Sequence, residues 1–394
     1  MSGSLSIDGL LAAAGADDAS QFVARFAHAP GTQVHFGLGA IGKIGSLARQ
    51  SGCSKALVVT DPGIEDAGHL DKVLGSLRDL GVAPVLFDQV IENPTTETVD
   101  ACLAVAQAGK IDGIIGVGGG SSMDTAKGCN FLISNGGRMQ DYWGIGKAKK
   151  SMLPLLVIPT TAGTGSECQS FALISDARTH QKMACGDKKA AAMHAILDPE
   201  LTLTQPPRVA AVTGIDALAH AVESAVSSKR SEVSYAYSKT AFRLLSRGFP
   251  RIIKTPGDIT ARGMMQLGAA FAGVAIENSM LGAAHAAANP LTAHFDVVHG
   301  IAVGVMLPEV IRHNKSDEDS AGWYCDLYPG DLASLVRGFL VEAELPARLS
   351  QCQVDPSDFP MLAREAAQQW TARFNPVAVS ERAFLGLYEA AWGG

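Results

Sequence analysis

The stretch Gly113-Ile-Ile-Gly-Val-Gly-Gly-Gly-Ser-Ser-Met-Asp124 decides the fold of this chain of 394 residues. Its first half is a short apolar run, which is typical of a buried β-strand, and a helical pattern begins at Met123. The glycines between them let a backbone approach a ligand closely, and the free N–H groups at a helix N-terminus attract phosphate. The turn lacks the spaced GxGxxG pattern, so a plain tight turn explains it as well as a phosphate site does.

A second turn of the same kind, Pro159-Thr-Thr-Ala-Gly-Thr-Gly-Ser-Glu167, follows the apolar run at residues 153–158. Its threonine hydroxyls either cap the turn or contact a ligand. Two such turns at the carboxyl ends of neighbouring strands lie where ligands bind in open α/β sheets. Together they favour a dinucleotide site over purely structural glycines.

Apolar runs and amphipathic stretches alternate through the first half of the chain. The runs cover residues 56–60, 84–87, 113–117 and 153–158, and helical patterns cover residues 70–80 and 96–108. Near-continuous apolar runs predict strands that are covered on both faces. Alternation of strand and helix predicts a parallel sheet with helices on both sides, so we expect a Rossmann-like α/β domain.

Strand signals vanish after Pro206-Pro207. Helical stretches rich in alanine and leucine follow at residues 209–228, 235–247, 259–276 and 280–288, and the tail at 331–392 is also helical in pattern. The most apolar segment, 264–276, is too short to span a membrane and contains Gln266, so we expect a buried helix. We predict an α/β domain at residues 1–205, with residues 1–30 as an N-terminal arm, and an all-α domain at residues 206–394.

The charge balance excludes some classes of partner. Lysine and arginine number 32, and aspartate and glutamate number 39, which leaves a net charge of −7. Proteins that bind nucleic acid or anionic membranes carry a basic surplus, so we expect neither partner. The seven cysteines form no CxxC pair, which argues against a disulfide framework and a four-thiolate zinc site. Because Asp8 and Asp17 lie where a signal peptide would be apolar, we predict a cytoplasmic protein.

Asp61 ends the apolar run at residues 56–60. An acidic side chain at the end of a strand can accept hydrogen bonds from the ribose hydroxyls of NAD and repel the 2′-phosphate of NADP. An aspartate that shapes the turn before Pro62-Gly63 is an equally good interpretation.

Asp216 and His220 stand four residues apart in a helical stretch, so both side chains leave the same helix face. His285 and His299 follow farther along the chain. Three imidazoles and one carboxylate suit a divalent transition metal that keeps a position open for a substrate oxygen. His285 lies in an apolar Gly-Ala-Ala-His-Ala-Ala segment, where a histidine is more often a core residue with satisfied hydrogen bonds. Spacing alone leaves a metal site and core histidines as equal alternatives.

Taken together, these motifs resemble the iron-containing (group III) alcohol dehydrogenase family. The matching stretches occur in the family's order: Gly118-Gly-Gly-Ser-Ser-Met-Asp-Thr-Ala-Lys127, Pro159-Thr-Thr-Ala-Gly-Thr-Gly-Ser-Glu167, Asp198-Pro-Glu-Leu201, Gly214-Ile-Asp-Ala-Leu-Ala-His-Ala221 and His299-Gly-Ile-Ala-Val-Gly304. The likeness runs from about residue 34 to 314 and weakens toward Asn375-Pro376. It implies a nucleotide-binding α/β domain, an all-helical domain and an active site between them.

The resemblance also implies roles for individual residues. The metal ligands would be Asp216, His220, His285 and His299, with Fe²⁺ as the expected metal and Zn²⁺ as the alternative. The positions that match the NAD site are Asp61, Asn93, Gly119, Gly120, Ser121, Thr160, Thr161, Thr164 and Lys182. No catalytic residue beyond the metal site is assigned.

Asn289 is the one departure from the family pattern. Many members have a second histidine four residues after the third ligand, and this chain has Asn289 there. Asparagine cannot act as a base, so a proton would pass through water, the cofactor ribose or another side chain. The change also fits a subgroup with a different substrate.

The resemblance implies a dimeric, NAD(H)-linked alcohol dehydrogenase or aldehyde reductase that acts on a small alcohol or aldehyde by hydride transfer. The metal would act as a Lewis acid on the substrate oxygen. One alternative is a reductase of an acidic aldehyde or an oxoacid, similar to maleylacetate reductase. Another is a lyase similar to dehydroquinate synthase, and a third is a protein that binds NAD or metal without catalysis.

Overall fold

The computed structural model describes residues 5–16, 32–179 and 181–393. Two compact units account for them. The first is built mainly from residues 32–161 and 165–205, and the second from residues 10–16, 162–164 and 206–393. Most of the expected arm at residues 1–30 lies outside the described residues, and its described part forms helix α1 (Ile7–Ala13).

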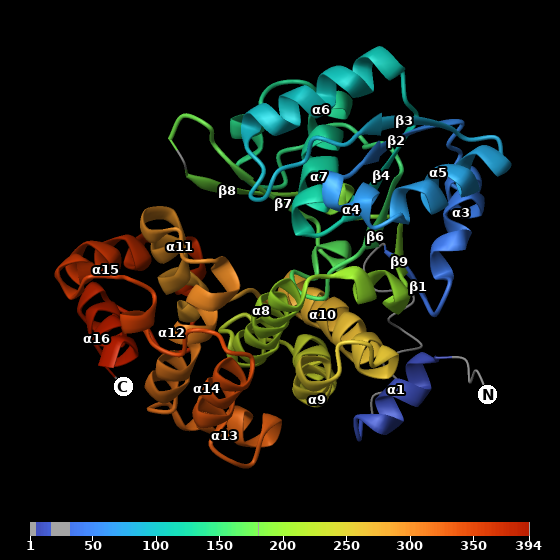
Figure 1. The fold of residues 1–394 in the computed structure, drawn as a ribbon. Helices are drawn as coiled ribbons and strands as arrows, with labels where there is room; N and C mark the ends of the chain where they lie inside the picture. The colour runs from blue at the N-terminus through green and yellow to red at the C-terminus, as the bar shows by residue number, and fades with distance from the viewer. Residues whose placement is uncertain (1–4, 17–31, 180, 394) are drawn as a thin grey trace. The chain divides into compact units, whose positions relative to one another are not determined.

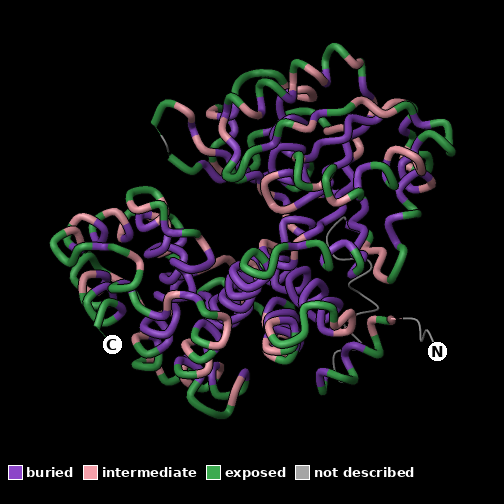
Figure 2. The backbone as a smooth tube through the Cα atoms, viewed as in Figure 1, coloured by how far each residue is buried: buried purple, intermediate pink, exposed green. Residues whose placement is uncertain are grey.

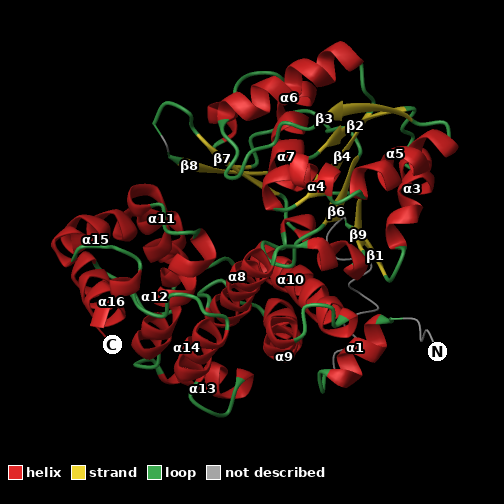
Figure 3. Ribbon diagram, in the orientation of Figure 1, coloured by secondary structure: helices red, strands yellow, loops and turns green. Residues whose placement is uncertain are grey.

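A parallel sheet of six strands forms the centre of the first unit (Figures 1 and 3). Its strands, in spatial order, are β1 (Gln33–Phe36), β9 (His194–Leu197), β6 (Leu155–Pro159), β4 (Gly113–Gly118), β2 (Lys55–Val59) and β3 (Ala83–Phe87). The expected runs therefore form β2, β3, β4 and β6. The edge strand β1 and its neighbour β9, which are four residues each, were not predicted.

Side chains on the sheet alternate between its two faces, as the strand period requires. Val58, Ile115 and Ile158 belong to one apolar cluster, and Leu57 and Ile114 belong to another. The first cluster is completed by helices α3 (Ile44–Gln50) and α5 (His69–Asp79), and the second by α6 (Thr96–Gly109) and α7 (Gly120–Asn135). Helices thus cover both faces, as expected.

Strand β3 differs from the expectation that the strands are covered on both faces. Among its residues only Phe87 is buried, whereas every residue of β4 and β6 is buried. β3 pairs only with β2, so it is an edge strand and one side of it stays open.

The order of the strands places a switch point between β2 and β4. The chain leaves β2 through α4 (Pro62–Asp66) and α5 to reach β3 on one side, and it leaves β4 through α7 toward β6 on the other side. Ligands of open α/β sheets bind outside the carboxyl ends of strands at such a point. Here these ends carry Asp61 and the glycine turn at residues 118–120.

A small second sheet in the first unit was not predicted. It contains β5 (Gly144–Ile145), β8 (Lys182–Gly186) and β7 (Phe171–Ser175), with β7 and β8 antiparallel. β5 has only two residues and β8 begins with lysine, so neither shows a long apolar run, whereas β7 contains the apolar run Phe171-Ala-Leu-Ile174, which the sequence analysis overlooked.

The second unit is helical, and residues 206–393 contain no strand. Its helices are α8 (Pro207–Val226), α9 (Glu232–Lys254), α10 (Ile259–Ser279), α11 (Ala283–Phe295), α12 (His299–Asn314), α13 (Glu318–Leu327), α14 (Leu332–Glu342), α15 (Phe359–Gln368) and α16 (Glu381–Gly393). Helix α11 begins three residues later than expected, because Met280 adopts a φ of 94° at the end of α10. Helix α7 begins at Gly120, earlier than the predicted Met123.

Helices α8 and α10 form the interior of the second unit, and Figure 2 shows them largely buried. Both are long and apolar enough to cross a membrane by length and composition, but 89% of each apolar window is buried inside the protein. The expected buried helix at residues 264–276 is therefore confirmed within α10. Core helices of this kind are hydrophobic on all sides because neighbouring helices surround them.

Candidate functional site

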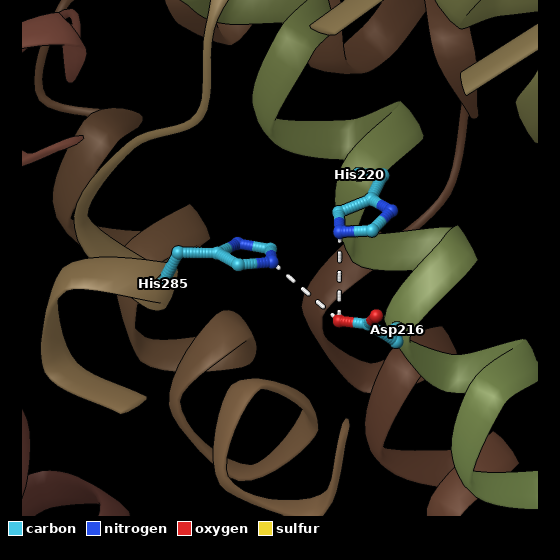
Figure 4. A group of neighbouring side chains, drawn as sticks. All are labelled: Asp216, His220 and His285. Carbon is cyan, nitrogen blue, oxygen red and sulfur yellow. Dashed lines mark ion pairs between the residues drawn. The ribbon is translucent and has the colours of Figure 1, made fainter. Parts of the chain in front are cut away.

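Helix α8 carries Asp216 and His220 on one face, as their spacing of four residues predicts. Both side chains are buried, and Nε2 of His220 lies 3.6 Å from Oδ1 of Asp216. Figure 4 shows the two side chains pointing toward each other from successive turns of the helix.

Two further histidines bring Nε2 atoms to the same oxygen. Nε2 of His285, from the first turn of α11, lies 3.5 Å from Oδ1 of Asp216 (Figure 4). Nε2 of His299, the first residue of α12, lies 4.0 Å from that oxygen. The structure therefore gathers all four candidate ligands around Asp216. His285 is buried, so burial alone is also consistent with the alternative of a core histidine.

The buried atoms of this cluster have the spacing of ligands around one ion. Oδ1 of Asp216 and Nε2 of His285 have no hydrogen-bond partner among the described residues. Ligands placed about 2.1 Å from a tetrahedral metal lie about 3.4 Å apart, close to the observed distances. Unpartnered buried polar atoms are costly, and a divalent cation would satisfy them. The cluster thus has donor types that suit a divalent metal, and Asp216, His220 and His285 lie close enough together that they could hold one ion.

His299 is the least tightly placed of the four. The candidate ligand atoms of Asp216, His220 and His285 all lie within 4.8 Å of one another, and His299 is not in that group of three. Its side chain is 28% exposed, against 5% for His285. A tight three-residue cluster with a fourth, more open donor leaves one side of the group accessible.

Charge within the cluster favours an ionised carboxylate. Burial would raise the pKa of Asp216, but the facing histidines, His220 first, outweigh burial and hold that pKa well below its usual range. Burial lowers the pKa of His220. Burial also acts to lower the pKa of His285, but the carboxylates of Glu223 and Asp216 prevail and raise it to about 9. The group is arranged to attract a cation at Asp216.

Sequence reasoning missed Glu223. This buried residue of α8 contacts Nδ1 of His285 through Oε2, and its Oε1 accepts a hydrogen bond from the N–H of Ala284 at 2.6 Å. The available signal was spacing: Glu223 follows His220 by three residues, so it continues the helix face that carries the candidate ligands.

The glycine turn at the end of β4 has the backbone geometry of a ligand cradle. Gly118 has a φ of 142°, and a Cβ on it would lie 2.5 Å from Oγ of Ser122, so only glycine fits. Gly119 is the N-cap of α7 and supplies no side-chain cap, which leaves N–H groups of the first turn for another acceptor. The candidates Gly120 and Ser121 are the first two residues of that helix.

Each of the two carboxylate oxygens of Asp61 accepts a hydrogen bond. Oδ1 accepts a hydrogen bond from the N–H of Gly63 at 3.0 Å and so caps α4. Oδ2 accepts one from Oγ of Ser122 at 3.2 Å. The turn-shaping interpretation is therefore confirmed, and the carboxylate also lies beside the glycine turn, where a ribose contact remains a prediction.

The threonine turn continues from β6, the neighbour of β4 in the sheet. The N–H of Thr160 donates to the carbonyl of Gly118 at 3.0 Å, and Thr161 faces Gly119, where a Cβ would meet its side chain at 3.5 Å. The two turns therefore lie side by side, as the sequence predicted. Thr164 belongs to the second unit, where Gly163 packs so closely on Thr213 of α8 that a Cβ would lie 2.6 Å away.

The candidates Asn93 and Lys182 come from different parts of the first unit and meet. Nζ of Lys182, the first residue of β8, lies 3.5 Å from Oδ1 of Asn93. Asn93 adopts a φ of 52°, a conformation that asparagine tolerates better than most residues. The structure thus brings the two side chains together, and their contact with a cofactor stays a prediction.

Asn289 lies one helical turn after His285 on α11. Its Nδ2 donates a hydrogen bond to Oε1 of Gln369 at 3.0 Å. The side chain is half-buried, and Gln369 directly precedes the short helix Trp370–Phe374. The Asn289 amide is thus held by a second amide, and neither group titrates.

Comparison with known proteins identifies relatives across nearly the whole chain. The family model "Iron-containing alcohol dehydrogenase" matches residues 31–199, and "Fe-containing alcohol dehydrogenase family, C-terminal" matches residues 210–392. Alcohol dehydrogenase 4 of Schizosaccharomyces pombe is 32% identical over 365 residues, which cover 90% of this chain and 86% of the relative. The NAD-dependent methanol dehydrogenase of Bacillus methanolicus is 31% identical, with 86% and 93% covered.

The fold is also similar to that of a solved structure. The crystal structure of a 1,3-propanediol oxidoreductase superposes with a TM-score of 0.88 at 30% identity, covering 91% of this chain and 97% of the other. The similarity therefore spans both the parallel sheet and the helical unit.

Proposed function

The chain belongs to the family of iron-containing alcohol dehydrogenases and is a metal-dependent, NAD-linked oxidoreductase, and we propose that its active centre is the cluster of Asp216, His220, His285 and His299. Its substrate would be a small alcohol or the corresponding aldehyde or ketone. One observation carries this proposal: Oδ1 of Asp216 is buried with no hydrogen-bond partner in the described part of the chain, and it faces three imidazole Nε2 atoms at 3.5–4.0 Å.

The residues of the cluster would hold the metal, Fe²⁺ in the first place and Zn²⁺ as the alternative. When bound, the metal supplies Lewis acidity toward the substrate oxygen, and NAD supplies the hydride acceptor. Asp216 and His220 are placed for this by a buried helix, which limits their movement. His299 is more exposed, so the open side of the cluster lies next to it.

The glycine and threonine turns would bind the cofactor. The N–H groups at the start of α7, at Gly120 and Ser121, would donate to the pyrophosphate, because a helix N-terminus attracts anions. Asp61 would accept hydrogen bonds from the adenosine ribose. Thr160, Thr161, Thr164, Asn93 and Lys182 would make the remaining contacts that the family resemblance implies.

Asn289 would line the substrate side of the helix without transferring a proton. Its amide has no titrating group, and it already donates to Gln369. Proton transfer during turnover would then use water, the cofactor ribose or another side chain. This position would distinguish the chain from relatives that have a histidine there.

We further propose a role for each domain, a cellular location and an oligomeric state. Residues 1–205 would form the NAD-binding domain and residues 206–394 the metal-binding domain. The seven cysteines are all free thiols, which supports a reducing cytoplasmic location, and the family resemblance supports a dimer. Light scattering of the purified protein tests the dimer.

The activity is tested by following NADH absorbance at 340 nm. Metal-free protein should be inactive with a panel of alcohols and aldehydes, and added Fe²⁺ or Zn²⁺ should restore turnover. A panel that includes acidic aldehydes and oxoacids determines the substrate class. Tight NAD binding without net turnover on any substrate, with metal present, would contradict the dehydrogenase proposal and support a lyase or a binding protein.

A further inference from the structure

The first turn of helix α11 is capped by side chains from elsewhere in the second unit. The N-cap residue Gly282 has no side chain to cap the turn. Instead, the N–H of Ala283 donates to Oδ1 of Asn375 at 3.2 Å, and the N–H of Ala284 donates to Oε1 of Glu223 at 2.6 Å. Because His285 is the next residue, these two contacts fix the position of the backbone from which its side chain extends.

The same glutamate also contacts the imidazole. Oε2 of Glu223 lies against Nδ1 of His285, and the glutamate is only 3% exposed. A carboxylate can only accept hydrogen bonds, so Nδ1 of His285 is the donor in this contact. Nε2 of His285 is then the nitrogen left for the ion, and it is the atom that faces Oδ1 of Asp216 at 3.5 Å.

We propose that Glu223 is a positioning residue for the metal centre: it fixes the orientation and the tautomer of His285 while it caps α11. The inference rests on the proposed function, because it assumes that His285 binds a metal. Histidine ligands commonly donate their second N–H to a carboxylate, which orients the ring and makes the ligating nitrogen more basic. Here one carboxylate also fixes the backbone that carries the ligand.

Two features around Glu223 support this role. A Cβ on Gly282 would lie 2.9 Å from Oδ1 of Asn375 and 3.1 Å from Oε1 of Glu223, so a side chain there would displace both acceptors. Asn375 is itself held, because its Nδ2 donates to Oδ1 of Asn314 and to the carbonyl of Val377, each at 2.7 Å. Both capping groups are therefore fixed before any ligand binds.

The substitution Glu223→Gln separates this role from simple packing. Glutamine has nearly the shape of glutamate, but its amide offers one acceptor atom and one donor atom. If the oxygen faces Ala284, the NH₂ group faces Nδ1 of His285 and favours the tautomer that carries hydrogen on Nε2. If the amide is reversed, two donors meet at the N–H of Ala284. Either way, one of the two functions of Glu223 is lost.

The matched control is Glu309→Gln. Glu309 is a buried glutamate of α12 that accepts hydrogen bonds from Arg312 of the same helix and from Arg337 of α14. This variant removes a buried charge in the same unit without touching Ala284 or His285. It therefore reports the general cost of such a substitution.

Metal-free wild type, Glu223→Gln and Glu309→Gln are titrated with Zn²⁺ alone, in competition with a chelating dye. We expect a loss of affinity of about tenfold to a hundredfold for Glu223→Gln, which is usual for the partner of a ligating histidine, and no change beyond twofold for Glu309→Gln. Affinity of Glu223→Gln within twofold of wild type would overturn the inference. If wild type itself bound no Zn²⁺ or Fe²⁺, the proposed metal site would fail instead.

Nuclear magnetic resonance of wild-type protein with ¹⁵N-labelled histidine gives a second measurement that does not depend on the Glu223→Gln variant. The His285 signals are identified by their absence in a His285→Gln sample. In zinc-loaded wild type we expect a Nδ1 proton that exchanges slowly with water and resonates far downfield, as a hydrogen bond to a carboxylate requires. A rapidly exchanging Nδ1 proton would overturn the inference.

Discussion

Oγ of Ser122, in the first turn of α7, donates a hydrogen bond of 3.2 Å to Oδ2 of Asp61, the residue that follows β2. The bond joins the loops at the carboxyl ends of two adjacent strands, at the point where the chain connections turn to opposite sides of the sheet. It holds a carboxylate next to the N–H groups at the start of α7. The Asp61 carboxylate, which we propose selects NAD, is therefore held in place by the glycine turn. We propose that the same turn binds the pyrophosphate of NAD.

The first prediction concerns the choice between NAD and NADP. Wild type should prefer NAD, because the Asp61 carboxylate would repel a 2′-phosphate. Asp61→Gly should weaken NAD by very roughly tenfold to a hundredfold, equivalent to about 1.5–3 kcal/mol for a lost charged hydrogen bond, and should admit NADP. Steady-state kinetics with both cofactors measures the ratio.

Asp61→Asn is the control for the capping role. Asparagine keeps an acceptor for the N–H of Gly63, so it should preserve the cap on α4, which is worth about 1 kcal/mol. It removes the charge, so it should also admit NADP. If neither variant changes the NAD/NADP ratio and Asp61→Gly only loses stability, the ribose assignment is wrong.

The second prediction concerns the metal. Chelator treatment should abolish activity, and His285→Ala should lose bound metal while it keeps the helical circular dichroism of wild type. His294→Ala is the matched control, because His294 pairs with Glu365 at the surface and lies outside the cluster. Elemental analysis of the purified proteins measures the metal. Full metal content and normal turnover in His285→Ala would falsify the assignment.

The third prediction concerns Asn289. Asn289→His should be tolerated and should shift the pH–rate profile near neutral pH, where an imidazole with a pKa of about 6.5 titrates. Asn289→Ala also loses the bond to Gln369 but adds no titrating group, so its profile should match that of wild type. If Asn289→His leaves both the profile and the substrate preference unchanged, this position takes no part in proton transfer.

The fourth prediction concerns Glu167, which follows the threonine turn. Burial raises the pKa of its carboxyl from 4.5 to about 7. The folded protein therefore holds this proton more tightly than the unfolded chain, so the stabilisation is complete below pH 4.5 and is lost as the pH rises to about 7. The free energy of unfolding should fall by about 1.4 kcal/mol per pH unit in that window.

Glu167→Gln isolates this contribution, because glutamine does not titrate. Chemical denaturation of both proteins at pH 5 and pH 8 should show that wild type loses about 2.5 kcal/mol more than the variant between the two values. Parallel losses in the two proteins would mean that Glu167 titrates normally.

Much of the α/β unit followed from local sequence. The buried strands β2, β4 and β6 and the helices α5 and α6 lie where apolar runs and amphipathic stretches predicted them. In the small sheet, β5 is only two residues long and β8 begins with lysine, so local sequence gives little signal for them, whereas the apolar run of β7 was a signal that the sequence analysis overlooked. Strand β3 was predicted as covered on both faces, but it lies at the edge of the sheet, and the helices there leave most of its residues partly or fully exposed.

The sequence also placed only some of the residues of the candidate site. Asp216 and His220 are related by helix spacing, so the sequence alone placed them on one face. His285 and His299 come from other helices, so the residues alone left a metal site and core histidines as equal alternatives, and only the fold brought their Nε2 atoms within 4.0 Å of Asp216. Glu223 was missed because its spacing from His220 does not reveal that it contacts a residue 62 positions away.

By itself, the sequence determined the type of most elements, the glycine-only turn at Gly118 and the residue types available for a metal and a dinucleotide. These properties depend on side-chain periodicity and backbone freedom within a few residues. Only the tertiary structure decided the order of the strands, the contact of Ser122 with Asp61 and the contact of Glu223 with His285. Such contacts join elements far apart in the chain, so they arise from the packing of whole helices and strands, which no local pattern specifies.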